Sequence, residues 1–201
     1  MENNTNKIAN IKIDKDNMIL KSSKNIYCES FYFMDMYDEN LYKKFIKQTE
    51  RIIRSSKEYN AYIEELRTNI HALNYDSIMS NICNADADLE IHHYPLTLYD
   101  IVEVIVNYHL INKDKITSFS IAKEVMECHF KNIIGIVSLT TTNHQLAHTG
   151  SIFLNKKQIF GNYEEFLNIY SNGVNVEIKN KIERLNKLSD NNTAIDFKGI
   201  L

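Results

Sequence analysis

Residues 89–95 read Leu-Glu-Ile-His-His-Tyr-Pro, and residues 136–150 read Ile-Val-Ser-Leu-Thr-Thr-Thr-Asn-His-Gln-Leu-Ala-His-Thr-Gly. Together these two stretches contain four of the seven histidines and the only proline of the chain. The first alternates apolar and polar residues as a strand does, and it ends at its proline. The second begins as a β-branched strand, continues into threonines that can cap a helix, and stops at a glycine. The pair predicts two strands and a helix arranged around the histidines.

The helix of the second stretch carries His144 and His148, four residues apart. Side chains at this spacing share one helix face, so both imidazoles can reach one metal ion. Zinc proteases use the same spacing, but in their motif a glutamate follows the first histidine and acts as the general base. Gln145 holds that place here, and an amide cannot take up a proton. The sequence therefore excludes the zinc-protease mechanism.

The remaining ligand of such a site has to come from another part of the chain, and His92 and His93 are the obvious source. Adjacent residues on a strand point to opposite faces. One imidazole can therefore face the helix and bind metal, while the other, close to the turn at Pro95, can be directed toward a substrate. A structural zinc site that uses all four histidines is the alternative interpretation.

The order of these residues resembles the HNH (His-Me finger, ββα-metal) endonucleases, above all colicin-type DNases and phage-encoded HNH proteins. The resemblance is carried by residues 89–95 and 132–150, which hold Glu90-Ile91-His92-His93, a strand led by Asn132, a Thr-rich turn, and the His144/His148 pair. Two features depart from the family pattern. An inserted segment, residues 96–131, separates the doublet from Asn132. The cysteine pair that braces many HNH fingers is absent, as it is in colicin-type fingers.

The resemblance implies one divalent ion, either Mg²⁺, Mn²⁺, Ni²⁺ or Zn²⁺, held by His92, His144 and His148. It implies that His93 is the general base that deprotonates a water for attack on phosphorus. Asn132 would hold that base through its backbone, with Asn143 as the second candidate for this catalytic role. Lys156 and Lys157 follow the finger and are candidates for nucleic-acid contacts, although a solvated surface accounts for them equally well. Glu90 and Asp100 are expected to be solvated or to orient an imidazole.

The length of 201 residues and the 44% of hydrophobic residues allow one good core with a small appendage. We expect an α+β fold in which the ββα-metal motif is embedded in a mainly helical domain. Four regions are predicted: a polar N-terminal arm (1–33), a helical platform (34–80), an HNH-like core (81–172) with a helical insertion (96–131), and a C-terminal helix and tail (173–201). Within the core, residues 152–161 are predicted to form a hairpin.

Composition narrows the functional classes. With 23 basic and 26 acidic residues the net charge is −3, which disfavours a protein that coats nucleic acid. Three widely separated cysteines exclude a disulfide framework and suit a reducing compartment. The apolar runs are too short to span a bilayer, and the amino terminus does not resemble a signal peptide. We expect no membrane partner and a location in the cytoplasm, which for a phage protein means the host cytoplasm or the virion.

The main hypothesis is a metal-dependent endonuclease that hydrolyses phosphodiester bonds of DNA, with RNA as the other candidate substrate. The alternative is a phage virion or assembly protein that keeps the finger with structural zinc and no catalysis, and whose partners are virion or packaging proteins. The mildly acidic charge favours this alternative, whereas the intact His93 favours the enzyme, because folding does not need a base. A binding module without cleavage lacks the basic stripe that it would need. His71, His109 and His129 are expected to be ordinary surface or core histidines.

Overall fold

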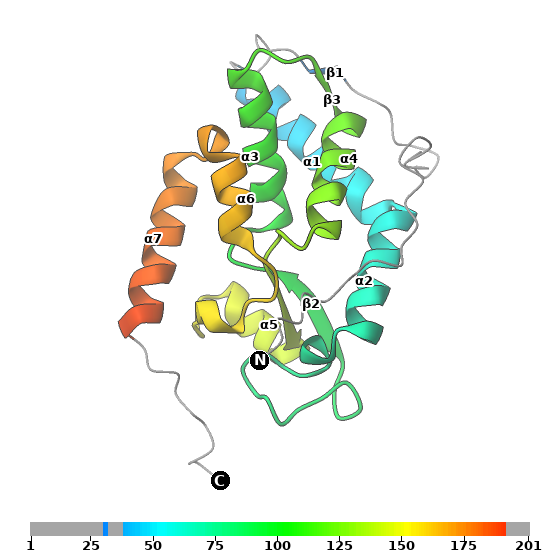
Figure 1. Cartoon of the computed structure of the whole chain (residues 1–201), viewed down its shortest axis with the longest axis vertical. Coiled ribbons are helices and arrows are strands. Elements are labelled where there is room, and N and C mark those ends of the chain that lie inside the picture. The colour runs from blue at the N-terminus through cyan, green and yellow to red at the C-terminus, as the bar shows by residue number, and fades with distance from the viewer. Residues whose placement is uncertain (1–29, 32–37, 192–201) are drawn as a thin grey trace.

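Helices dominate the part of the chain that the computed structural model describes, residues 30–31 and 38–191 (Figure 1). The α-helices are α1 (Glu39–Ser55), α2 (Lys57–Asn69), α3 (Leu98–Ile111), α4 (Ser118–Phe130), α5 (Thr141–His148), α6 (Tyr163–Ile169) and α7 (Val176–Asn191). Short 3-10 helices are η2 (His71–Asn74), η3 (Lys156–Gln158) and η4 (Ser171–Gly173). The strands are β1 (Ser30–Phe31), β2 (Leu89–His93), β3 (Ile116–Thr117) and β4 (Ile136–Thr140), and they pair antiparallel as β1–β3 and β2–β4. The predicted α+β class is confirmed, while most of the predicted arm and the end of the tail lie outside the described residues.

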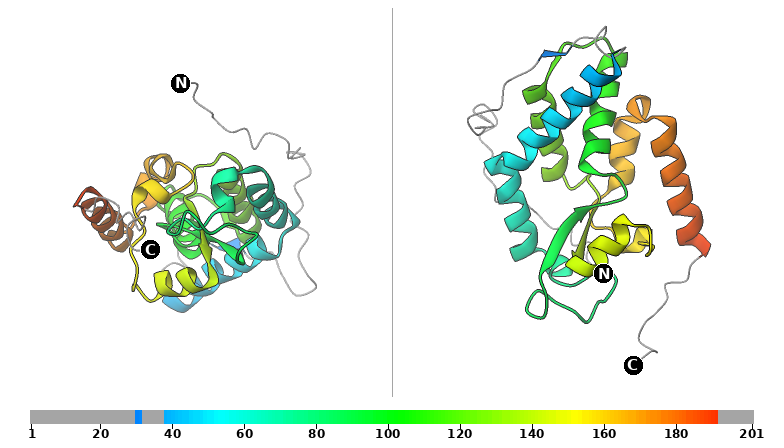
Figure 2. Two further views of the ribbon diagram at one scale, coloured as in Figure 1. Left: turned by 90° about the horizontal axis from the view of Figure 1, so that it is seen from below. Right: turned by 180° about the vertical axis from the view of Figure 1, so that it is seen from behind.

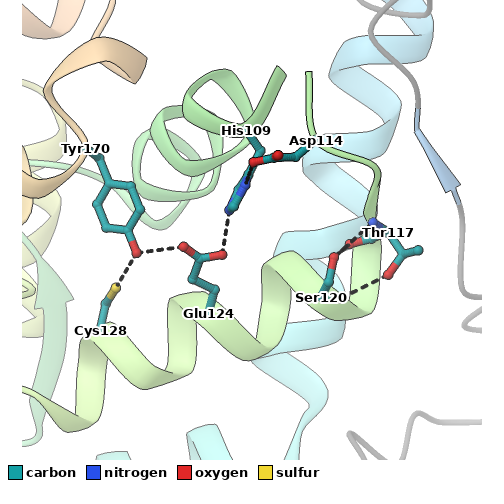
Figure 3. A network of polar contacts seen from close by, with 7 residues as sticks. All are labelled: His109, Asp114, Thr117, Ser120, Glu124, Cys128 and Tyr170. Atoms are coloured by element: carbon teal, nitrogen blue, oxygen red, sulfur yellow. Dashed lines mark hydrogen bonds and ion pairs between the residues drawn. The ribbon is translucent and has the colours of Figure 1, made fainter. Parts of the chain in front are cut away.

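Local capping signals set the helix starts. Thr97 and Asp100 form a reciprocal capping box at the start of α3, as Thr117 and Ser120 do for α4. The α4 box is drawn in Figure 3. Thr140, the last residue of β4, accepts a hydrogen bond from the α5 backbone through its side chain. Each box satisfies backbone N–H groups that a helix start would otherwise leave unpaired. Because Thr140 belongs to β4 and caps α5, the helix follows the strand without an intervening loop.

Helices α1, α3 and α4 pack into a bundle, and the β2–β4 pair with α5 lies at one end of it, with α7 along the side (Figures 1 and 2). One main hydrophobic core is built from buried residues of the bundle and its neighbours. Its members include Phe45, Ile52, Tyr62, Leu66, Val104, Ile105, Val125, Met126, Ile136, Phe166 and Ile178. A second, smaller cluster of Val137, Leu139 and Leu154 joins β4 to the segment that follows α5. The unit formed by β2, β4 and α5 is called the finger below. The finger therefore contributes to both clusters, with Ile136 in the main core and Val137 and Leu139 in the smaller one.

A network of polar contacts joins α3, α4 and the end of α6 (Figure 3). It extends from the buried Cys128 to the exposed Asp114. His109 contacts Asp114 through Nδ1 at 2.8 Å and Glu124 through Nε2 at 2.7 Å. Tyr170 donates its hydroxyl to the other oxygen of Glu124 at 2.8 Å, and the Cys128 sulfur lies 3.6 Å from that hydroxyl. Burial alone would lower the pKa of His109, but its two carboxylate partners outweigh burial and raise it. His109 is thus an ordinary partnered histidine, as expected.

The hairpin predicted for residues 152–161 is wrong. Asn155 and Gln158 form a capping box that folds the middle of this segment into η3. Phe160 then pairs with Ile136 through two backbone hydrogen bonds of 2.8 Å, forming an isolated bridge on β4. The segment pairs with β4 because the side-chain caps of Asn155 and Gln158 satisfy the backbone groups that a hairpin would have used.

Candidate metal centre

The metal-ligand candidates come from β2 and α5. The β2–β4 register places His92 opposite Val137, and α5 leaves the end of β4 directly. His144 Nε2 lies 2.9 Å from His92 Nδ1 and 2.9 Å from His148 Nε2. The three atoms all fall within 4.8 Å of one another, which is the spacing of ligands to a single ion. The structure thus brings together the three histidines that the sequence resemblance predicted as ligands.

Glu90 contacts the cluster through Nδ1 of His144, the ring nitrogen that does not face the other two histidines. It lies two residues before His92 on β2, so both side chains point to the same face of the strand. Its Oε2 contacts His144 Nδ1, and its Oε1 accepts a hydrogen bond of 3.4 Å from Thr141 Oγ1. A carboxylate on one imidazole nitrogen fixes the tautomer and leaves the other nitrogen free for a metal. Glu90 therefore directs Nε2 of His144 toward His92 and His148.

The electrostatics at His92 favour a neutral imidazole that can bind metal. Burial is the main cause that lowers the pKa of His92 to about 4, and the charges of His144, His148 and Lys181 act in the same direction. His92 is therefore neutral at physiological pH and does not have to lose a proton to bind metal. In a tetrahedral site with metal–nitrogen distances of about 2.1 Å, the ligand nitrogens lie roughly 3.4 Å apart. The observed separations of 2.9 Å are close to that value.

His93 lies on the opposite face of β2 and does not join the cluster. Its side chain is buried, with a residue exposure of 5%. Its Nε2 lies 2.9 Å from Nε2 of His129, whose Nδ1 is 2.7 Å from the Val125 carbonyl oxygen. The ring of Tyr59 stacks over His93 at a centroid distance of 6.1 Å. The structure therefore encloses the residue predicted as the general base, and it does not bring four histidines to one ion.

Asn132 serves to end α4. Its backbone has a left-handed φ of 56°, which stops the helix. Its N–H donates to the carbonyl of His129, and its carbonyl accepts from the N–H of Asn162 at 2.7 Å. These backbone bonds reach His129 and Asn162 rather than His93. The structure thus gives Asn132 a helix-ending position and does not bring it to the predicted base.

Asn143 belongs to a polar anchor that the sequence did not reveal. It is buried, and its Nδ2 donates to Oδ2 of Asp76 at 2.9 Å. The same oxygen of Asp76 accepts from the N–H of Thr140, and Oδ1 accepts from the N–H groups of Ile78 and Met79. Burial raises the pKa of the Asp76 carboxyl, but these hydrogen bonds outweigh burial and lower it. Asp76 thus pins the start of α5, and with it His144 and His148, to the loop before β2.

The two predicted nucleic-acid contacts lie on η3, beside α7. Lys156 pairs with Asp190 at 2.6 Å, and its backbone N–H donates to the hydroxyl of Ser189. Lys157 is exposed, and its backbone N–H donates to Asn155. The structure therefore gives Lys156 an intramolecular partner and leaves Lys157 facing solvent.

Comparison with known proteins finds one family model that matches almost the whole chain and not only the segments that carry the histidines. The model of the bacteriophage G278-like virion protein family matches residues 1–199. Neither the curated proteins nor the solved structures contain a match. Within the described residues, no helix combines the length and the hydrophobicity needed to cross a membrane. Because the match extends over almost every residue, the chain belongs to the bacteriophage G278-like virion protein family.

Proposed function

We propose that this chain is a component of the phage particle or its assembly, and that it binds one divalent metal ion through His92, His144 and His148. The observation that carries the proposal is the convergence of their three ring nitrogens, with Glu90 on the far nitrogen of His144. Imidazole suits Zn²⁺ and Ni²⁺ best among the candidate ions. Membership of a virion protein family supports the place of action.

The ion has a structural task in this proposal. Apart from the contacts of Ile91 and Ile136 with the main core, the finger has only the small apolar cluster of Val137, Leu139 and Leu154. Small folding units with little core commonly depend on a bound metal. An ion shared by β2 and α5 would join the two halves of the finger, with Asp76 securing α5 from the other side.

Metal-dependent hydrolysis of phosphodiester bonds in DNA or RNA is the second candidate function. One observation favours it: the described residues offer three protein ligands, whereas structural zinc sites usually have four. A divalent ion with an open position supplies Lewis-acid activation of water or of a phosphate oxygen. His93 would have to part from His129 to act as the base, and for that reason the structural task ranks first.

Metal binding is tested with chelator-stripped protein by calorimetry and by thermal unfolding with added Zn²⁺, Ni²⁺, Mn²⁺ or Mg²⁺. We expect binding of one equivalent and a rise in the thermal midpoint, both of which His148→Ala abolishes. Gln145→Ala, at an exposed position of the same helix but outside the His144/His148 face, is the control and should behave as the native chain. Absence of binding by every ion, or equal binding by His148→Ala, would overturn the proposal.

Plasmid nicking by the metal-loaded protein separates the two functions. The structural task predicts no nicking with any of the four ions. Nicking that disappears in both His148→Ala and His93→Ala, while the fold is retained, would instead establish the hydrolase.

A further inference from the structure

A groove of about 260 Å³ begins at His92, beside the proposed metal centre. The segment that follows α5 forms one wall, and α7 forms the other. Its lining includes the apolar side chains of Tyr94, Phe153, Leu154, Leu185 and Leu188. The Tyr94 hydroxyl donates to the Leu154 carbonyl at 3.1 Å, which holds the tyrosine ring along the groove. The groove therefore combines flat aromatic surface with one end at the histidine cluster.

The wall that α7 contributes is amphipathic. Lys181 and Arg184 line the groove together with Leu185 and Leu188, each cation four residues before a leucine on the same helix face. Lys181 is engaged by the Asp100 carboxylate at 2.9 Å. Within residues 38–191, by contrast, no carboxylate forms an ion pair with Arg184. The groove, which His92 also lines, thus offers one guanidinium without a carboxylate partner among these residues.

A guanidinium, a divalent ion and aromatic rings in one groove suit a ligand that carries both a phosphate and a flat ring. A guanidinium and a divalent ion both bind phosphate oxygens, and a phosphodiester has two non-bridging oxygens that can bridge them. Aromatic rings beside such charges stack against nucleobases. A base can reach them only when it is unpaired, because a duplex keeps its bases inside the stack. An acidic peptide could satisfy the charges but would not use the flat surfaces of Tyr94 and Phe153.

We propose that this groove binds one nucleotide of a single-stranded nucleic acid, with its phosphate between the metal ion and Arg184 and its base against Tyr94 and Phe153. The proposal rests on the metal centre proposed above and does not require cleavage. The chain would then hold a strand at one point rather than along a basic face. That agrees with its net charge of −3. The salt dependence of affinity should accordingly be shallow, since log K falls by about 0.7 for each tenfold rise in salt concentration when one phosphate of a single strand is neutralised.

The test is fluorescence anisotropy with labelled dodecathymidylate and with the corresponding duplex, using protein saturated with Zn²⁺. We expect the single strand to bind more tightly than the duplex, and chelation to weaken its binding. Arg184→Glu should weaken binding about tenfold or more. Lys187→Glu makes the same charge change on the same helix at an exposed position outside the groove, and it should change affinity less than about twofold. Phe153→Ala, which keeps the charge, should weaken binding by at least about fivefold.

Calorimetric metal binding by each variant is measured first, so that failure of the metal centre and failure of the groove are separate results. A protein that binds no ion overturns the metal centre, and the groove proposal falls with it. A protein that binds its ion but not the oligonucleotide overturns the groove alone. Equal losses in Arg184→Glu and Lys187→Glu would mean general electrostatic attraction and would also overturn it. So would tighter binding of poly-L-glutamate than of the oligonucleotide, because the groove would then suit an acidic protein segment.

Discussion

His93 and His129 face each other inside the core with their Nε2 atoms 2.9 Å apart, although His92, the preceding residue, faces the solvent side of the finger. The alternation of a strand therefore separates the two members of the histidine doublet. One is directed to the metal cluster and the other to the helical core. Through β2 the finger is thus tied to α4, which suits a folding unit more directly than a catalytic site.

The His93–His129 pair should make the protein sensitive to mild acid. Burial lowers the pKa of His129 to about 4 and also lowers the pKa of His93. Between pH 6.5 and 4 the unfolded chain binds protons at these residues and the folded chain does not, so stability falls as pH falls. His129→Leu should lower the free energy of unfolding at pH 7 by about 2–3 kcal/mol, because His93 loses its partner.

Urea unfolding from pH 7 to pH 4.5 checks this prediction. The native chain should lose stability over that range more steeply than His129→Leu, which has one fewer buried site to protonate. Parallel pH curves for the two proteins would contradict it.

Asp76 should be a determinant of stability and of metal affinity at once. Asp76→Asn replaces one acceptor oxygen by an NH2 group. Two donors then lose their acceptor, either Thr140 and Asn143 or the pair Ile78 and Met79. We expect a loss of about 2–3 kcal/mol at pH 7. Metal affinity should also weaken, because α5 is no longer pinned. The folded pKa of Asp76 is lowered, so this contribution is present above the ordinary aspartate value and is lost as pH falls through the folded one.

Chemical unfolding at pH 7 and pH 3, together with metal titration, measures both effects. Asp86→Asn removes an exposed carboxylate that accepts from the Cys83 backbone, and it is the matched control. The difference between Asp76→Asn and the native chain should shrink at pH 3. A difference as small as that of Asp86→Asn at pH 7 would show that the anchor does not matter.

Local signals explain why much of the fold could be predicted from the sequence. Ser56 and Thr97 have the hydroxyl side chains typical of helix caps, and they cap α2 and α3. Thr140 belongs to the threonine run that was predicted to cap the helix now seen as α5. The i,i+4 spacing of His144 and His148 made their common face readable without a structure. Such patterns involve neighbours along the chain, where spacing and geometry are directly related.

Features that depend on distant partners could not be predicted in the same way. The bonds from Asp76 to Thr140 and Asn143 join residues more than sixty positions apart in the sequence. The orientation of His93 depends on His129 lying beneath β2, and the pairing of Phe160 with Ile136 replaced the expected hairpin. In each case the partner is distant in the sequence, so no local pattern could indicate it.

Glu90 should tune the metal centre without binding the ion. Glu90→Gln keeps the shape of the side chain but removes the charge that holds Nδ1–H of His144. Loss of such a support typically weakens metal affinity by about 10–100-fold. Asp88→Asn, an exposed change of the same charge one position before the strand, should leave affinity within about twofold. Competition with a chromophoric chelator measures the metal affinity of both variants. Equal affinities for Glu90→Gln and the native chain would show that Glu90 does not contribute to the site.

The network around His109 should give a pH dependence of opposite sign to that of His129. The pKa of His109 is raised in the folded chain by its contacts with Asp114 and Glu124. Its contribution to stability is therefore fully present below the unfolded pKa of about 6.5 and is lost as pH rises through the folded value. His109→Gln should cost about 1–2 kcal/mol at pH 5.5 and less at pH 9. Thermal unfolding of both proteins at these two pH values gives the result, and a loss that grows toward pH 9 would mean that His109 acts as a neutral hydrogen-bond donor, without the ion pairs that join α3 to α4.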